Sequence, residues 1–152
     1  MSSHDRLAAL RLAPLLALVV LTACGPTLLL PGGALEGEPA SAPEDWRFTD
    51  EVSTIQLETH PQDPYSVNLW AVGIGDRLYV HAGANRSTWV EHLEADPSAR
   101  LRVDDRIYAL TAQRVGSQDE FDVFADAYEA KYGTRPREED VNVAYLFRLV
   151  PR

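Results

Sequence analysis

Residues 65–82 read YSVNLWAVGIGDRLYVHA, which is the pattern of a β-hairpin. Tyr65 to Val72 and Arg77 to Ala82 are rich in aliphatic, β-branched and aromatic side chains, which indicates two well-buried strands. Residues 73–76 separate them, and their two glycines permit the left-handed conformations that a tight hairpin turn needs. Because a strand and not a helix follows these glycines, they form a hairpin turn and not a phosphate-binding loop.

Before this hairpin the sequence predicts one more strand, and after it a short helix. Val52 to Glu58 alternates apolar and polar residues, as a half-buried strand does, and the prolines of residues 60–64 end it. Residues 83–85 form a small-residue loop, and Ser87 or Asn85 can cap the helix that follows. The apolar face of that helix consists of Trp89, Val90 and Leu93.

The second half of the chain predicts another hairpin, a longer helix and a closing strand. Residues 117–120 are a capping box, in which Ser117 accepts from an N3 amide and Glu120 reaches back to the start of the helix. Gly133 ends that helix, whose apolar face is aromatic. The predicted strands are Leu101 to Val103, Arg106 to Val115 and Val141 to Val150.

This order of elements predicts a strand-dominated α+β fold with two helices. About six strands with little helix between them are expected to curl into a small barrel, because a doubly wound parallel sheet needs a helical crossover after each strand. The folded part is therefore expected to have one core and to form one domain.

Three stretches then resemble the split-barrel proteins of the pyridoxamine-phosphate-oxidase-like group, which includes deazaflavin-dependent nitroreductase-like proteins. They are NLWAV at 68–72, GDRLYVHAG at 75–83 and WVEHLEADP at 89–97. The resemblance covers roughly residues 52–150 and keeps the family's order of strand, turn, strand, loop and helix. It implies a small split β-barrel, an FMN- or deazaflavin-type cofactor, a homodimer, and oxidation or reduction by hydride transfer.

The resemblance also implies which residues would meet the cofactor. Arg86 and Ser87 would hold its phosphate, while Trp89 or His81 would line the ring pocket. A glycine-bearing loop before a helix offers amide donors to a phosphate, and an arginine adds a bidentate partner. The cofactor-binding residues expected on this basis are His81, Gly83, Asn85, Arg86, Ser87 and Trp89.

One loop departs from the family pattern. Many relatives carry basic residues and glycine between the first two strands, where they hold the phosphate. Here residues 60–64 read HPQDP, with one aspartate and neither arginine nor lysine. This loop would repel a phosphate, which favours a barrel without flavin chemistry.

The N-terminus has the pattern of an export signal. Arg6 and Arg11 precede an apolar run from Leu12 to Leu21, which is too short to span a bilayer as a helix. Leu21-Thr22-Ala23-Cys24 resembles the lipobox of bacterial lipoproteins, whose cysteine carries acyl chains such as palmitate after cleavage. An ordinary secretory signal with an incidental cysteine, or an uncleaved apolar segment, is the alternative.

Three segments are therefore expected. They are a lipoprotein signal peptide at 1–23, a lipidated tether rich in Pro, Gly, Ala, Ser and Glu at 24–45, and a split-barrel domain at 46–152. Under the lipobox resemblance, Gly25 after the cysteine implies an outer-membrane protein that faces the periplasm.

Charge and residue types exclude several classes of function. The chain carries a formal charge of −9; the expected signal has two arginines and one aspartate, so its removal leaves −10. Such acidity argues against nucleic acid as a partner. With Cys24 acylated, no thiol remains for a disulfide. The histidines lack the spacing of a zinc site, so no metal is expected.

Two functions of different class remain at this point. The first is a lipid-anchored envelope protein with a noncatalytic or degenerate flavin-type split barrel that binds a small ligand or a partner. The second is a membrane-tethered oxidoreductase that uses an FMN- or deazaflavin-type cofactor. The HPQDP loop favours the first.

Overall fold

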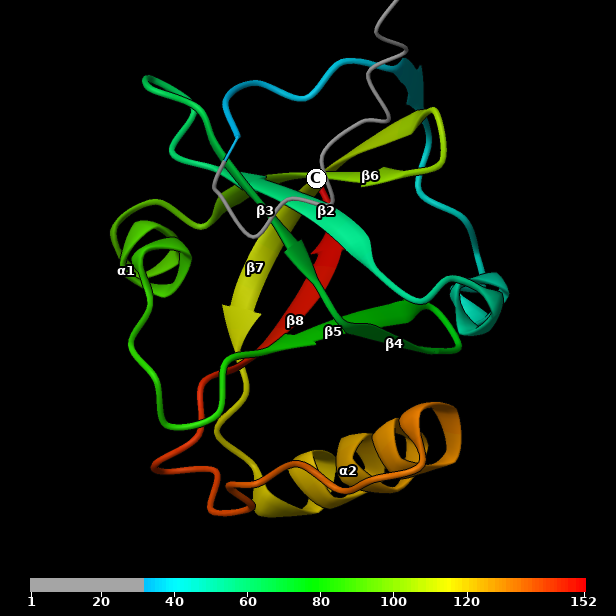
Figure 1. Ribbon diagram of the computed structural model, residues 1–152, viewed down its shortest axis with the longest axis vertical. Helices are drawn as coiled ribbons and strands as arrows, with labels where there is room; N and C mark the ends of the chain where they lie inside the picture. The colour runs from blue at the N-terminus through cyan, green and yellow to red at the C-terminus, as the bar shows by residue number, and fades with distance from the viewer. Residues whose placement is uncertain (1–31) are drawn as a thin grey trace, which may run out of the picture.

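The computed structural model describes residues 32–152 (Figure 1). The lipobox and the rest of the expected signal lie outside the described residues. In chain order the elements are β1 (Glu38–Ala40), the 3-10 helix η1 (Arg47–Glu51), β2 (Ile55–Thr59), β3 (Tyr65–Leu69), β4 (Ala71–Ile74), β5 (Arg77–His81), α1 (Thr88–Ala95), β6 (Ser98–Val103), β7 (Arg106–Arg114), α2 (Gln118–Tyr132) and β8 (Leu146–Pro151).

The strands form one curled sheet in the order β3-β2-β6-β7-β8-β5-β4, with β1 added in parallel to β7. All other pairs are antiparallel. The strand-dominated α+β fold is thus confirmed as a half-closed barrel, with two α-helices among residues 32–152. The described part of the chain has eight strands where the sequence predicts about six.

One of the extra strands arises at Trp70. The run from Tyr65 to Val72 is interrupted there: Leu69 pairs with Ile55 of β2, whereas Ala71 pairs with Val80 of β5. Because β3 and β4 stand at opposite ends of the strand order, this single residue carries the chain from one edge of the curled sheet to the other.

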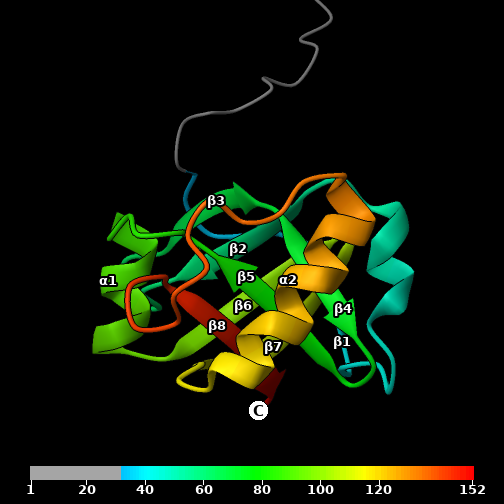
Figure 2. The same ribbon diagram turned by 90° about the horizontal axis from the view of Figure 1, so that it is seen from below.

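Helix α2 fixes this change of partner. It lies across β4 and β5 (Figure 2). Tyr132 Oη accepts from the Ala71 N–H at 3.1 Å and donates to the Ala71 carbonyl at 3.0 Å. Its ring stacks on the half-exposed ring of Trp70, with centroids 4.4 Å apart.

The β4–β5 turn is tighter than the predicted one. Ile74 pairs with Arg77, so only Gly75 and Asp76 form the loop, and Gly75 has a left-handed φ of 57°. Gly73 lies inside β4 instead, where the backbone of Trp46 approaches it closely; a Cβ there would lie 2.2 Å from the Trp46 carbonyl oxygen.

Two clusters of buried side chains form the core. The larger fills the barrel and includes Trp46, Leu57, Leu78, Leu101 and Leu149. The smaller lies between α2 and the sheet and includes Val72, Tyr79, Phe121, Phe124 and Leu146. The aromatic face predicted for the longer helix thus packs on the outer surface of β4, β5 and β8.

Helix α2 begins and ends where the sequence predicts, but one of the two predicted capping contacts is absent. Ser117 Oγ accepts from the Glu120 N–H, and Gly133 ends the helix at φ 74°. The Glu120 carboxylate, however, does not reach back. It accepts from Arg148 Nη1 at 2.9 Å and from Tyr79 Oη at 2.8 Å, so it joins the helix to the sheet. The closing strand begins at Leu146, after a turn that occupies residues 141–144.

Part of the segment expected as a tether packs against the barrel. Gly32 exchanges backbone hydrogen bonds with Ser66, and Leu35 is buried. The Leu35 N–H donates to Glu58 Oε2 at 2.5 Å, and the Leu35 carbonyl accepts from Arg100 Nη2 at 3.1 Å. The ion pair of Glu58 and Arg100 therefore holds both backbone groups of Leu35.

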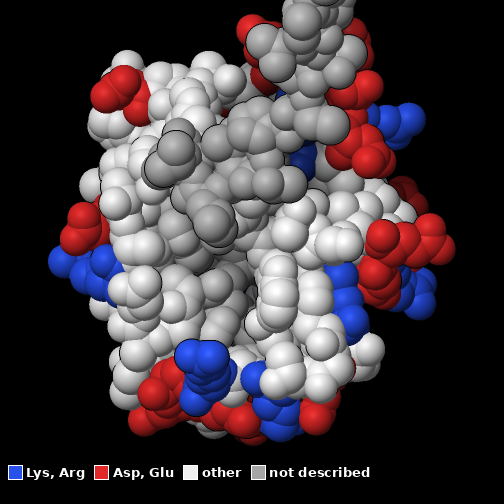
Figure 3. Space-filling view, viewed as in Figure 1, with Lys and Arg blue, Asp and Glu red and all other residues white. Residues whose placement is uncertain are grey.

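Within residues 32–152, no helix is long and apolar enough to cross a membrane. On the face shown in Figure 3, most of the visible charged side chains lie near the rim.

Candidate functional site

His81 ends β5 and faces the aromatic side of α2. Its ring centroid lies 5.5 Å from that of Phe124 and 6.2 Å from that of Tyr128. Nε2 is buried and has no partner among the described residues. Burial, with a smaller effect from the charge of Arg114, lowers the pKa of His81 to about 4, so the imidazole is neutral at pH 7. At neutral pH it therefore supplies no positive charge.

The loop after His81 is tied to the segment before β8. The Ala82 N–H donates to the Tyr145 carbonyl at 2.9 Å, and the Tyr145 N–H donates to the Gly83 carbonyl at 2.7 Å. Gly83 has a φ of 58°, a conformation that favours glycine and lets the chain turn toward α1. The predicted Gly83-to-Asn85 loop is therefore ordered by backbone bonds to a distant segment, and Asn85 itself is exposed.

Ser87 lies at the start of α1, whereas Trp89 lies in the barrel core. Ser87 is the N-cap residue of α1, but its Oγ makes no capping bond and is buried without a described partner. Trp89 is buried in the barrel core, where its ring lies 5.9 Å from that of Phe147. It packs inside the barrel and does not line the loop cavity described below.

Arg86 is occupied by carboxylates of the helix that follows it. Nη2 lies 2.7 Å and Nε 3.0 Å from Glu94 Oε2, and Nη1 lies 3.7 Å from Glu91 Oε1. These groups, Glu94 first, raise the pKa of Arg86 above its usual value. The only cation of the expected phosphate loop is thus already paired with two negative charges.

A cavity of about 530 Å³ opens beside the same loop. It is lined by Ala82, Gly83, Ala84, Asn85, Arg137 and Glu138. Arg137 is exposed and makes neither an ion pair nor a hydrogen bond with any described residue. Unlike Arg86, its guanidinium is not held by a carboxylate, although the Glu138 carboxylate lines the same cavity.

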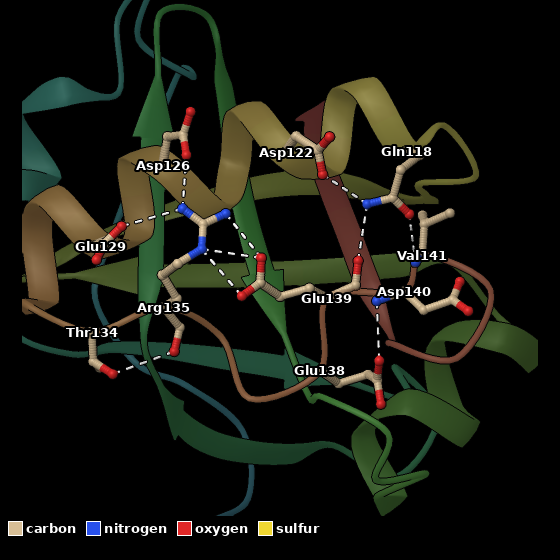
Figure 4. A network of polar contacts seen from close by, with 10 residues as sticks. All are labelled: Gln118, Asp122, Asp126, Glu129, Thr134, Arg135, Glu138, Glu139, Asp140 and Val141. Atoms are coloured by element: carbon tan, nitrogen blue, oxygen red, sulfur yellow. Dashed lines mark hydrogen bonds and ion pairs between the residues drawn. The ribbon is translucent and has the colours of Figure 1, made fainter.

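Arg135 positions the loop that carries Arg137. Its guanidinium lies 2.9 Å from Glu139 Oε2, 2.8 Å from Asp126 Oδ1 and 3.2 Å from Glu129 Oε2 (Figure 4). Because two of these carboxylates belong to α2, the network holds residues 135–139 along the helix. The same figure shows Gln118 contacting Asp122 and the Glu139 backbone, so the loop is fastened at both ends of α2.

The sequence indicates the loop of residues 83–85, but it does not indicate that Arg137 lies beside this loop or that the aromatic face of α2 contacts His81. Arg137 belongs to a stretch that reads as a polar connection, and its place beside Gly83 depends on the Arg135 network. The aromatic stripe of α2 was predicted as a helix face, but the sequence does not indicate that it faces His81. Of the six predicted residues, Gly83 and Asn85 line the cavity.

The residues present do not fit the phosphate of a flavin. Arg86 is paired with Glu94 and Glu91. In the loop 60–64, the His60 side chain is hydrogen-bonded to the Asp63 carbonyl, and the loop itself contains neither arginine nor lysine. A phosphate at the start of α1 would also face the Glu91 carboxylate in the first turn of that helix.

No protein-family model and no curated protein matches this chain. Solved structures do resemble it. A 5-nitroimidazole antibiotic resistance protein from Bacteroides thetaiotaomicron aligns with a TM-score of 0.53 at 11% identity, over 66% of this chain and 73% of that one. HutZ, the heme storage protein from Vibrio cholerae, aligns with a TM-score of 0.51 at 17% identity, over 69% and 85%.

The fold is a split barrel. At these identities the likeness concerns the fold alone, and the two neighbours carry different named roles. The split-barrel fold does not determine which ligand is bound, because binding depends on the side chains of the site.

Proposed function

We propose that this protein is a lipid-anchored protein of the bacterial cell envelope whose split barrel binds a small ligand or a partner without flavin chemistry. The observation that carries the proposal is the pairing of Arg86 with Glu94 at 2.7 Å. A flavin phosphate would have to displace this carboxylate and then remain close to it, so most of the Coulombic gain from the arginine is lost.

The cavity beside Gly83 suits a smaller ligand. Arg137 provides a guanidinium without an ion-pair partner, Asn85 provides an exposed amide, and Glu138 limits the net positive charge of the cavity. A compact molecule with one negative or hydrogen-bonding group fits these features better than a phosphorylated isoalloxazine does. The uncharged imidazole of His81 adds no charge at neutral pH.

Flavin titration tests this proposal. We expect FMN, FAD and a deazaflavin to give no saturable change in fluorescence or in Tm with the purified protein. Arg86→Ala should leave both signals as they are, and Arg106→Ala, another exposed arginine, serves as the control. Saturable binding that disappears in Arg86→Ala alone would instead support the membrane-tethered oxidoreductase.

The lipid anchor is tested separately. Cys24→Ala removes the sulfur that would carry the acyl chains, so we expect an unprocessed precursor or release of the protein into the soluble fraction. Cys24→Ser is the matched control because it preserves the size of the side chain and should behave in the same way. Normal processing and membrane retention of Cys24→Ala would contradict the lipobox proposal.

A further inference from the structure

A second cavity, of about 660 Å³, lies on another part of the barrel. It opens to solvent and is bordered by η1, β4 and the C-terminal half of α2, which lie on the same side of the molecule in Figure 1. Its lining residues are Arg47, Asp50, Val72, Gly73, Ile74, Gly75, Ala127, Ala130 and Lys131. None of them lines the cavity beside Gly83.

Lys131 is the only lysine of the chain, and it lines this cavity together with Arg47 and Asp50. Its Nζ donates to the Thr49 carbonyl at 2.6 Å and to the Ala71 carbonyl at 2.7 Å. No described carboxylate forms an ion pair with it. Burial lowers the pKa of Lys131, and the charge of Asp50 opposes this shift in part.

Among the described residues, no carboxylate lies at ion-pair distance from the Lys131 ammonium, although Asp50 lines the same cavity and acts on it over a longer distance. The ammonium has three donors, of which two are used by neutral carbonyl groups. Carbonyl dipoles satisfy hydrogen bonds but do not neutralise the charge, and partial burial strengthens any Coulombic attraction to an anion that enters. Apart from Arg47 and Asp50, the rest of the wall is aliphatic or glycine.

We propose that this cavity binds a small carboxylic acid with a short apolar tail. The carboxylate pairs with Lys131 Nζ, and the tail lies against β4 and Ala127. Arg47 at the rim is already paired with Asp45 at 2.5 Å and contributes little charge. Asp50 opposes the anion, so Asp50→Asn is expected to tighten binding several-fold.

Hexanoate is the probe, and hexan-1-ol is its uncharged control. Because the chain has one lysine, selective 13C labelling of lysine gives a single ε-methylene NMR signal from the side chain. We expect hexanoate to shift this signal saturably and to raise the pH at which it titrates, since an anion stabilises the ammonium. Hexan-1-ol should do neither. Absence of a saturable shift, or an equal shift with hexan-1-ol, would overturn the proposal.

Three variants separate ligand binding from a purely structural role of Lys131. Lys131→Arg keeps the charge and should retain the hexanoate-dependent rise in Tm, whereas Lys131→Met should lose it. Ala127→Leu keeps the lysine but fills the apolar wall, so it should also lose the hexanoate response. A response that persists in Ala127→Leu would contradict the site even if Lys131→Met fails to fold.

Discussion

Replacing Arg100 by methionine is expected to lower the free energy of unfolding by about 3 kcal/mol, because it leaves a buried carboxylate without its counter-ion. The Glu58 side chain is only 5% exposed, and both of its oxygens lie 3.1 Å from Arg100 Nη1. Because Arg100 is itself partly exposed, we expect a loss of stability at the lower end of the range that is usual when one partner of a buried ion pair is removed. Urea denaturation at neutral pH measures it.

Arg102→Met is the matched control. Arg102 lies two residues further along β6, on the same face, and donates only to the Glu36 carbonyl at 3.1 Å. We expect its loss to cost less than about 1 kcal/mol, as for an ordinary hydrogen bond. Faster hydrogen exchange of the Leu35 amide in Arg100→Met alone would show that the pair holds the N-terminal segment. Equal effects of the two substitutions would contradict this role.

Gly73→Ala is expected to destabilise the barrel by about 3 kcal/mol, at the upper end of the usual cost of overpacking. The added Cβ would lie 2.2 Å from the Trp46 carbonyl oxygen and 2.5 Å from its carbon. These are backbone atoms, so the segment of Trp46 and η1 must move away from β4. Thermal unfolding of both proteins measures the loss.

Gly116→Ala is the control for this substitution. A Cβ at Gly116 meets no atom within 4 Å, so this change should be neutral or slightly stabilising through the unfolded chain. A second consequence distinguishes the mechanism. Because η1 supplies the Thr49 carbonyl that accepts from Lys131, Gly73→Ala should also shift the ε-methylene signal of that lysine. A small and equal effect of both glycine substitutions would rule out the close backbone approach.

The strands and helices that depend on local pattern could be predicted from the sequence. The capping box at Ser117 and the stop at Gly133 are confirmed, and so are the hairpins around residues 75–76 and 104–105. Each of these depends on neighbouring residues alone: a side-chain oxygen, a left-handed glycine or a two-residue turn. The fold class follows from their order.

The break at Trp70 could not be predicted in the same way. The run from Tyr65 to Val72 has a continuous strand pattern, and the reason for its division lies in α2, whose Tyr132 bonds the backbone of Ala71. The packed segment before Trp46 was missed for a similar reason. Its Pro- and Gly-rich composition is typical of a tether, but Glu58 and Arg100 hold Leu35 from strands β2 and β6.

The candidate site was predictable in part. The loop after His81 follows from the residues themselves, and the lack of a basic residue in HPQDP was visible in the sequence. Arg86 precedes α1 and pairs with Glu94 near the end of that helix, so the pair depends on the direction in which the chain enters α1. The position of Arg137 beside Gly83 depends on the contacts of Arg135 with α2. The sequence shows which loop residues are charged, but the tertiary structure determines which residues they pair with.

Calorimetry with FMN and with riboflavin isolates the contribution of the phosphate to binding, because the two ligands differ only in that group. If Arg86 is neutralised by Glu94 and Glu91, FMN should bind no better than riboflavin, and Arg86→Ala should change neither result. An FMN affinity about tenfold or more above that of riboflavin, equivalent to about 1.4 kcal/mol, that is lost in Arg86→Ala would contradict the account and assign the barrel to flavin binding.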